Sequence, residues 1–431
     1  MRIGKRIVER AHCIGVGGIG MSALAQYLRD QGVAVTGSDR ERSPVTELLE
    51  RKGIAVIVPQ HPENVPANTD AVVYSDAVPE DNPERARAAE LNIPQYSYFS
   101  MLGEISAPMR TVAVAGTHGK TTTTGMLAKI LIDAGGTPTV IVGSIMKDFG
   151  SNYVAGDSDL FVVEACEYRD HLLELSPDVL VVTNLEWDHT DYFPSLAALQ
   201  ESFKKAIAKV PEHGAIVTNP SHPNIAAILG SAHARVIDYT KEPAYGLQLP
   251  GAFNVDNARA AAASARAVSP SITDAAIARS LAAFQGAWRR FEYKGKTKGG
   301  ATVYDDYAHH PTAIESTLAA LRGKTEGKVL VAFHPHLYSR TRDLFEAFSE
   351  SFKDADKIFL APIYAAREKD DGSVSSEMLA ERIRAHGVDA TALGSFDALF
   401  AALADAKPGD AIMTMGAGDI YKLADRLVAS K

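Results

Sequence analysis

The sequence predicts an α/β protein of three domains, each a mostly parallel sheet with flanking helices. Short apolar runs rich in β-branched residues alternate with helix-like stretches along the whole chain, and this alternation is typical of parallel sheets. A chain of 431 residues is also too long for one hydrophobic core. A short link at Ala107-Pro108 and the segment GAWRRFEYKG (286–295) mark the expected boundaries. The expected domains therefore comprise residues 1–108, 109–287 and 288–431.

The overall composition excludes several classes of protein. A net charge of −9 argues against a nucleic-acid partner, because such proteins carry a basic surface. Two cysteines, Cys13 and Cys166, cannot form a disulfide framework and favour a reducing compartment. The N-terminus lacks an apolar signal core, and no stretch approaches the ~20 apolar residues of a membrane span. We therefore expect a cytoplasmic protein without membrane insertion; the sequence does not separate a monomer from a homodimer.

The first domain opens with a strand, His12–Val16, that leads into a glycine-rich turn and a helix. A second strand, Ala34–Gly37, ends at Ser38-Asp39, nineteen positions past the last glycine of the turn. Taken alone, this is the dinucleotide fingerprint, in which Asp39 would bind a ribose. Two other readings stay open: a turn for another nucleotide, or simply the first turn of a parallel sheet. The turn spans residues 15–20, and its candidate binding residues are Gly15, Gly17, Gly18, Ile19 and Gly20.

The second domain begins with an apolar strand, Thr111–Ala115, followed by the turn G-T-H-G-K-T and residues suited to a helix. A strand, a glycine turn, Lys-Thr and a helix together form the arrangement that cradles phosphates. Lys120 would add a positive charge, and the hydroxyl of Thr121 could ligate Mg²⁺. The longer common motif would require glycine at position 114, where this chain has Val114. The alternative is a tight turn with a solvated lysine.

Two later strands of this domain, Asp159–Ala165 and Asp178–Leu185, end in polar residues. Ligands of open α/β sheets gather at the carboxyl ends of the strands, so these residues are expected near Lys120. A single acid at a strand end would more simply be a helix cap, but two such strand ends favour a Mg²⁺ site. The residues concerned are Glu164, Glu167, Asn184, Asp188 and His189.

A helix is predicted over Val255–Val268, and Asn254 and Asn257 are spaced to share its face. The pair could contact an adenine edge, or Asn254 could simply cap the helix. Farther along, Arg289 and Arg290 could clamp phosphate oxygens or could be solvated.

The third domain is predicted from strands Ala301–Tyr304, Lys328–Phe333 and Lys357–Ile363 and a last strand–helix unit, AIMTMGAGDIYKLADRL (411–427). The segment DDYAHHP (305–311) opens a helix over Thr312–Leu321. Its adjacent histidines could be metal ligands, but neighbouring residues rarely converge on one metal. A nucleotide turn, a phosphate loop and a third domain with arginine, histidine and acid clusters together fit ATP-driven joining of a nucleotide-carried substrate to a small partner. An NAD-dependent oxidoreductase and a non-catalytic nucleotide-binding protein remain as alternatives.

These motifs resemble those of the Mur ligase family, and most closely of its alanine-adding branch. The resemblance spans nearly the whole chain and implies a Rossmann-like N-terminal domain, a P-loop ATPase domain and a Rossmann-like C-terminal domain that closes on ATP. The matching segments are GVGGIGMSALA (15–25), SD (38–39), DNPE (81–84), AGTHGKTTTT (115–124), EA-x-E (164–167), TN-x-E-x-DH-x-D (183–191), N-x-x-N (254–257), RRFE (289–292), DDYAHHP (305–311), PH-x-Y-x-RTRDLF (335–345) and GAGDI (416–420).

The resemblance implies an amide ligase of peptidoglycan precursor synthesis, and hence a role in cell-wall formation, cell shape and division. ATP would phosphorylate the carboxylate of UDP-N-acetylmuramate, and the amine of L-alanine would attack the acyl phosphate. The implied cofactors are ATP and Mg²⁺. A related ligase with another amino acid or peptide is the alternative.

The resemblance also implies roles for individual residues. The positions matching the ATP site are Gly116, Thr117, His118, Gly119, Lys120, Thr121, Thr122, Asn254, Asn257, Arg290 and Asp306. Those matching the uridine-diphosphate site are Gly15, Gly17, Gly18, Ile19, Gly20, Ser38, Asp39 and Ser75. The implied metal ligands are Thr121, Glu164 and His189, and the implied catalytic residues are Lys120, His189, Glu164, Arg290 and His309. The residues expected on the amino-acid side are His336, Arg340 and Arg342.

The chain departs from the family pattern at a few places. Cys166 stands where the family has an acid, Arg169 follows where a further acid is usual, and Phe253 replaces a histidine. The stretch 240–251 is shorter than usual. Related ligases carbamylate a lysine near Lys204, which we expect here to be an ordinary surface residue.

Overall fold

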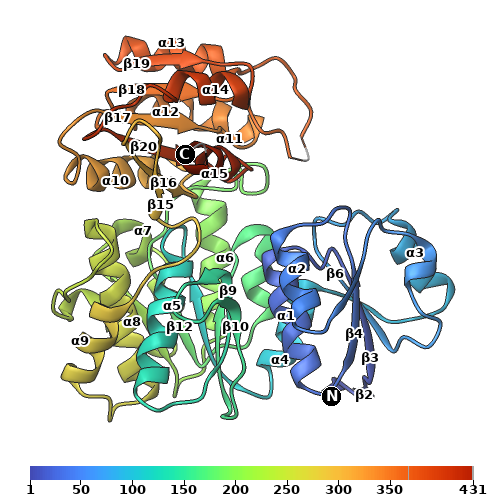
Figure 1. Cartoon of the computed structure of the whole chain (residues 1–431). Coiled ribbons are helices and arrows are strands. Elements are labelled where there is room, and N and C mark those ends of the chain that lie inside the picture. Colours follow the sequence, from blue (N-terminus) through green and yellow to red (C-terminus); the bar gives the residue numbers. More distant parts are fainter. Residues whose placement is uncertain (367, 430–431) are drawn as a thin grey trace. The chain divides into compact units, whose positions relative to one another are not determined.

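The computed structural model describes residues 1–366 and 368–429 and is shown in Figure 1. The chain separates into two compact units. The first consists of Met1–Leu185, Leu199–Gly246 and Asn257–Gln285. The second consists of Glu186–Ala198, Leu247–Asp256 and Gly286–Lys431. Among the residues described, none of the helices combines the length and the apolar content that crossing a bilayer requires.

The first unit begins with a five-stranded parallel sheet, shown in blue in Figure 1. Its order is β5-β4-β3-β6-β7, so the chain starts in the centre, moves to one edge and then crosses to the other. Ligands bind in such sheets where the strand order reverses, which here is at the carboxyl end of β3. The strands are β3 (Arg10–Ile14), β4 (Ala34–Ser38), β5 (Ala55–Ile57), β6 (Ala71–Tyr74) and β7 (Gln95–Ser97). The helices are α1 (Ile19–Asp30), α2 (Pro44–Arg51), η1 (Pro62–Asn64), α3 (Pro83–Glu90) and α4 (Tyr98–Ser106).

A seven-stranded sheet of order β10-β9-β11-β8-β12-β13-β14 forms the rest of the first unit. Its central strand β8 is fully apolar after its first two residues and is buried between two parallel neighbours, which explains the continuous apolar run. The strands are β8 (Arg110–Ala115), β9 (Thr139–Met146), β10 (Ser151–Val154), β11 (Leu160–Glu164), β12 (Val179–Val182), β13 (Ala215–Thr218) and β14 (Arg235–Asp238). The helices are α5 (Lys120–Asp133), η2 (Tyr168–Glu174), α6 (Leu196–Ala208), α7 (Pro223–Ala226), η3 (Leu229–Ser231), η4 (Tyr239–Lys241), α8 (Ala252–Val268) and α9 (Asp274–Ala283). The first residues of α6 and α8 belong to the second unit.

The second unit contains a six-stranded sheet of order β15-β16-β20-β17-β18-β19. Alternate residues of β17 belong to different apolar clusters: Val329, Val331 and Phe333 to one, Leu330 and Ala332 to the other. Because side chains alternate across a strand, the sheet has a core on each face. The strands are β15 (Glu292–Lys296), β16 (Thr302–Asp306), β17 (Val329–Phe333), β18 (Lys357–Leu360), β19 (Asp389–Ala392) and β20 (Ala411–Met415). The helices are α10 (Pro311–Arg322), α11 (Tyr338–Asp343), α12 (Phe345–Glu350), α13 (Ser376–Ala385), α14 (Phe396–Leu403) and α15 (Tyr421–Ala429).

The α/β class with mostly parallel sheets is confirmed, but the strict alternation of strand and helix is not. Strand β10 pairs antiparallel with β9, and β15 pairs antiparallel with β16. The first residues form a further antiparallel pair, β1 (Arg2–Ile3) with β2 (Arg6–Ile7). The hairpin strands were missed although each connection contains glycine, the residue typical of hairpin turns, and Gly299-Gly300 joins β15 to β16.

Candidate functional site

The glycine turn after β8 fits tightly against its neighbours. Gly116 and Gly119 have φ of +125° and +82°, in the region that favours glycine. A Cβ at Gly116 would lie 2.2 Å from the Thr183 hydroxyl oxygen, and one at Gly119 would lie 2.1 Å from Oδ1 of Asn257. Both glycines are therefore required by conformation and by space.

The turn is also anchored by the residues that follow β12. The backbone N–H of His118 donates to Oδ1 of Asn184 at 2.8 Å, and that of Thr117 donates to the Asn184 carbonyl at 3.2 Å. The hydroxyl of Thr183 donates in turn to the His118 carbonyl at 2.6 Å. The predicted position of Asn184 beside the phosphate loop is thus what the structure has, and its role there is to hold the loop.

The ammonium group of Lys120 lies over the turn that precedes it. Its Nζ donates to the carbonyls of Gly116 at 2.5 Å and Thr117 at 3.1 Å, and to Oε1 of Glu167 at 2.9 Å. Burial opposes the charge, but the Glu167 carboxylate outweighs it and raises the pKa of Lys120 above its usual value. Lys120 therefore stays positively charged at a position where a helix N-terminus also favours an anion.

The predicted metal ligands of the first unit come together. The Thr121 hydroxyl donates to Oε1 of Glu164 at 3.0 Å, and Oε2 of Glu164 accepts the backbone N–H of Gly143 at 2.7 Å. A hydroxyl and a carboxylate are oxygen donors of the kind that Mg²⁺ takes, so the residues fit that ion. Thr122 is buried beside them in the first turn of α5. His189 belongs to the second unit, where it has φ of +54°.

Helix α8 carries both asparagines predicted for adenine. Oδ1 of Asn257 accepts from the Thr123 hydroxyl at 3.3 Å and lies against the phosphate loop, as the Gly119 contact shows. The helix begins at Ala252, three residues earlier than expected, so Asn254 lies in its first turn. The alternative of a plain N-cap is therefore wrong: Nδ2 of Asn254 donates to the Pro250 carbonyl at 2.7 Å.

The residues predicted for the uridine-diphosphate site lie where the strand order of the first sheet reverses. Gly15 follows β3, Asp39 follows β4 and Ser75 follows β6. Oδ2 of Asp39 accepts the N–H of Gly17 at 2.7 Å, and the Ser38 carbonyl accepts the N–H of Gly15 at 2.8 Å. A Cβ on Gly15 would approach the Cβ of Ser75 to 3.1 Å. The Asp39 carboxylate thus holds the glycine turn in place.

The end of this turn meets residues that sequence reasoning missed. Gly18 precedes α1 and Gly20 lies in its first turn, where a Cβ would come within 2.7 Å of the ring of Tyr98. The Ile19 carbonyl accepts from Nδ2 of Asn152 at 2.5 Å. No sequence signal identifies Tyr98 or Asn152, because both reach the turn from distant elements.

A buried carboxylate network supports the same crevice. Glu84 has no exposed surface, and it accepts hydrogen bonds from the hydroxyl of Ser38, from the His61 N–H at 3.0 Å and from Nδ2 of Asn64 at 2.7 Å. His12 lies 3.4 Å from it. Burial opposes ionisation, but these donors lower the pKa of Glu84. Glu84 therefore fixes the end of β4, and the DNPE segment was its only sequence signal.

In the second unit, the two adjacent arginines, Arg289 and Arg290, have different surroundings. Arg289 is buried, and its Nε donates to Asp305 at 2.8 Å. Its two terminal nitrogens donate to the carbonyls of Gly418 at 2.7 Å and Gly416 at 2.6 Å. The suggestion that Arg289 clamps phosphate is therefore wrong, because every nitrogen of its guanidinium is bonded inside the protein.

Arg290 and Asp306, both predicted for the ATP site, lie close enough to interact electrostatically. The Arg290 guanidinium lies 5.0 Å from the ring of Tyr307. Asp306 accepts the N–H groups of Phe291 at 2.6 Å and Ala308 at 2.7 Å. Burial raises the pKa of Asp306, although Arg290 and these donors favour the ionised form. Oδ2 of Asp306 thus holds the backbone next to Arg290, and Oδ1 holds the backbone at Ala308.

His336 and Arg340, predicted for the amino-acid side, form a cluster with Asp188 and His309. Nε of Arg340 donates to Oδ1 of Asp188 at 2.8 Å, and a terminal nitrogen lies 3.1 Å from Nδ1 of His336. Burial opposes the charge on Asp188, but Arg340 holds its pKa well below 3.8. The rings of His309 and His336 are 6.2 Å apart. We refer to these four residues as the His–Arg cluster.

Arg342 lies outside this cluster. It follows Arg340 by two positions on α11, and residues so spaced point in different directions. Its guanidinium is about half exposed and pairs with Asp343 at 3.0 Å and Asp371 at 3.4 Å.

The residues that depart from the family pattern, and Lys204, differ in their exposure and contacts. Burial raises the pKa of the Cys166 thiol to about 12, so it stays uncharged. Arg169 has φ of +52° and an exposed side chain. Lys204 is partly exposed and pairs with Glu201 at 3.4 Å. Phe253 is partly buried in the first turn of α8.

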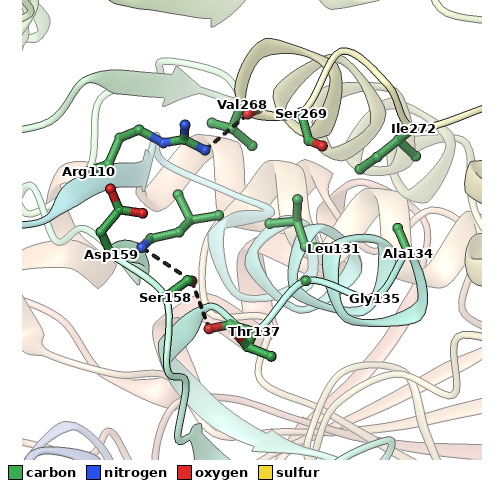
Figure 2. A pocket seen from close by; sticks show the side chains of 12 residues that line it. Arg110, Leu131, Ala134, Gly135, Thr137, Ser158, Asp159, Val268, Ser269 and Ile272 are labelled. Atoms are coloured by element: carbon green, nitrogen blue, oxygen red, sulfur yellow. Dashed lines mark hydrogen bonds between the residues drawn. The ribbon is translucent and has the colours of Figure 1, made fainter.

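A pocket of about 290 Å³ lies at the opposite edge of the central sheet (Figure 2). It is lined by Arg110 at the start of β8 and by Asp159, which precedes β11. In Figure 2 the Arg110 guanidinium donates to the Val268 carbonyl at 3.0 Å. Because ligands of parallel sheets bind at the carboxyl ends of the strands, this pocket is not the predicted nucleotide site.

Comparison with known proteins agrees with this geometry. The model described as Mur ligase family, catalytic domain, matches residues 10–110. The Mur ligase middle domain matches residues 114–247, and the Mur ligase, glutamate ligase domain matches residues 289–418.

Individual relatives match over nearly their whole length. A UDP-N-acetylmuramate–L-alanine ligase of Acetivibrio thermocellus is 39% identical, with 98% of this chain and 96% of that protein covered. The enzyme of the same name from Clostridium acetobutylicum is 36% identical, with 98% of each covered. The crystal structure of UDP-N-acetylmuramate-alanine ligase from Thermotoga maritima superposes with a TM-score of 0.79 at 26% identity, covering 97% of this chain and 98% of that one. On this evidence the chain belongs to the Mur ligase family.

Proposed function

We propose that this protein is an ATP-dependent ligase that joins L-alanine to the carboxylate of UDP-N-acetylmuramate in peptidoglycan precursor synthesis. The observation that carries the proposal is that one unit contains two different glycine turns, each after a parallel strand. One turn is followed by Lys120, which pairs with Glu167, and the other has no lysine and donates an N–H to Asp39. An enzyme that used ATP alone would not need the second turn.

The phosphate loop is proposed to bind ATP. Lys120 would lie against the terminal phosphates, and its hydrogen bonds to loop carbonyls and Glu167 keep its ammonium at the mouth of the turn. Asn257 would contact the adenine from the face of α8. Thr121 and Glu164 would hold Mg²⁺, which would neutralise charge on the phosphates; the family resemblance implies His189 as a further ligand.

The chemistry requires little beyond positioning and charge neutralisation. A carboxylate oxygen of the sugar-linked acid attacks the terminal phosphorus, and ADP leaves. The amino group then attacks the carbonyl carbon of the acyl phosphate, and phosphate leaves with the electron pair of the broken C–O bond. Arg290 is proposed to face the phosphoryl group, because Asp306 holds the backbone beside it.

The domain boundaries at residues 108 and 288 are part of the proposal, as are the cytoplasmic location and a monomeric or homodimeric state. Support for the boundaries comes from the sheets, since the first ends with β7 before residue 108 and the third begins with β15 after residue 288.

The test is phosphate release measured with every combination of ATP, UDP-N-acetylmuramate and L-alanine. We expect release only when all three are present with Mg²⁺. Release without the two acceptors would contradict the proposal.

A panel of amino acids and short peptides in the same assay addresses substrate choice. L-alanine is expected to give the highest kcat/KM. A preference for another amino acid or for a peptide would reassign the enzyme within the family. Membership of a ligase family stands against the oxidoreductase alternative, and Lys120→Ala would exclude a binding-only role if it abolishes an activity that the parent has.

A further inference from the structure

The hydrogen bond of His309 fixes which of its ring nitrogens carries a proton. Nδ1 lies 2.8 Å from the carbonyl oxygen of Tyr307. A carbonyl can only accept, so Nδ1 is the donor and carries the hydrogen. In the neutral ring the lone pair is then on Nε2, which is the nitrogen directed away from the backbone.

The surroundings of His309 keep its ring neutral. Burial lowers the pKa of His309 well below 6.5, and the Arg340 guanidinium acts in the same direction. Asp188 raises the pKa of His309, His336 lowers it further, and the hydrogen bond to the Tyr307 carbonyl raises it by favouring the protonated form. The balance leaves a basic lone pair on Nε2 at neutral pH.

In His336 the ring hydrogen is on the other nitrogen. A terminal nitrogen of Arg340 lies 3.1 Å from Nδ1 of His336, and a guanidinium can only donate. Nδ1 of His336 therefore accepts, and its hydrogen is on Nε2. The ring is held in place by stacking on Tyr364, with ring centres 5.5 Å apart. Within the His–Arg cluster, His309 thus offers an acceptor and His336 a donor.

Amide formation requires such an acceptor. When an amine attacks an acyl phosphate, the new C–N bond leaves a positive charge on nitrogen. We propose, on the basis of the proposed function, that Nε2 of His309 accepts the proton that this nitrogen sheds. The C–O bond to phosphate breaks, phosphate leaves with the electron pair, and the protonated ring returns its proton to solvent, which its partly exposed position allows.

His309→Asn tests the role, because asparagine keeps an N–H that can reach the Tyr307 carbonyl but has no basic nitrogen. Two nucleophiles are compared, L-alanine and hydroxylamine, both with ATP, Mg²⁺ and UDP-N-acetylmuramate. The hydroxyl group of hydroxylamine makes its adduct far more acidic, so that adduct loses its proton to water unaided. The exposed His386→Asn is the matched control.

We expect His309→Asn to lower amide formation about 10²- to 10⁴-fold and to change hydroxamate formation less than about threefold. His386→Asn should change neither rate. Equal losses with both nucleophiles would show a structural role, and an unchanged alanine rate would show no role; either result overturns the inference. A parent that forms neither amide nor hydroxamate would instead refute the proposed function.

A measurement on the unaltered enzyme covers the case of a variant that does not fold. Because the pKa of His309 lies well below 6.5, the ratio of amide to hydroxamate should stay constant near neutral pH and fall only when the pH is lowered well below 6.5, where the ring is protonated and cannot accept a proton. A ratio that stays constant even there would overturn the inference.

Discussion

Replacing Gly119 by alanine perturbs the phosphate loop at a point where the structure predicts the size of the effect. Gly119 has φ of +82°, and an alanine in this conformation costs about 1–2 kcal/mol. Its Cβ would also lie 2.1 Å from Oδ1 of Asn257, whereas ordinary contacts begin at 3.4 Å. The asparagine must therefore move by more than about 1 Å, a displacement that can reduce a rate about 10²-fold.

Gly135→Ala is the matched control. Gly135 has φ of +87° and nothing within 4 Å of its added Cβ, so it carries the same conformational cost without the contact. Gly135→Ala should lose about 1–2 kcal/mol of stability in urea unfolding, and Gly119→Ala should lose at least as much, because its Cβ also displaces Asn257. Only Gly119→Ala should weaken ATP binding, by about tenfold or more, as measured by titration calorimetry. Equal ATP affinity in the two variants would refute the placement of Asn257 at the phosphate loop.

Three further variants test other parts of the account. Lys120→Ala should abolish phosphate release, while Lys204→Ala, at a partly exposed lysine, should leave it unchanged. Substantial activity in Lys120→Ala would contradict the role of the loop. Arg340→Met leaves the Asp188 carboxylate buried without its partner and should destabilise the protein by about 3–5 kcal/mol at pH 7. Because Arg340 depresses the pKa of Asp188, the ion pair stabilises the folded protein above pH 3.8, and this stabilisation is lost as the pH falls below that value. The free energies of urea unfolding of the parent and Arg340→Met should therefore converge in acid. A difference that stays constant with pH would argue against the ion pair. Glu84→Gln replaces an acceptor of several hydrogen bonds and should cost about 1–3 kcal/mol while raising the KM for UDP-N-acetylmuramate and not that for ATP; equal changes in both KM values would deny the link to Ser38.

The parts of the site that follow chain order could be predicted from the sequence. Gly119, Lys120 and Thr121 follow one strand and Glu164 follows its neighbour, and parallel strands present their carboxyl ends at one edge. The hydrogen bond from Thr121 to Glu164 is a consequence of that rule. Asp39 was indicated by the fingerprint and Ser75 by the family resemblance, and both lie near the turn at Gly15.

The parts that depend on contacts between distant segments could not be predicted. Ser38 and Glu84 are separated by 46 positions, and nothing in either local sequence indicates their bond. The buried Arg289 has the same surroundings in sequence as Arg290, and only the carbonyls of the 416–418 segment distinguish the two. The start of α8 was misplaced because Phe253 and Asn254 are weak helix formers and follow a proline and a glycine.

The most direct test of the central claim is the identity of the nucleotide product. The enzyme is incubated with ATP, Mg²⁺, UDP-N-acetylmuramate and L-alanine, and the products are measured by mass spectrometry. The account predicts one ADP and one phosphate for each amide formed, because the loop at Lys120 transfers the terminal phosphoryl group. Formation of AMP and pyrophosphate, or of ADP without any amide, would contradict it.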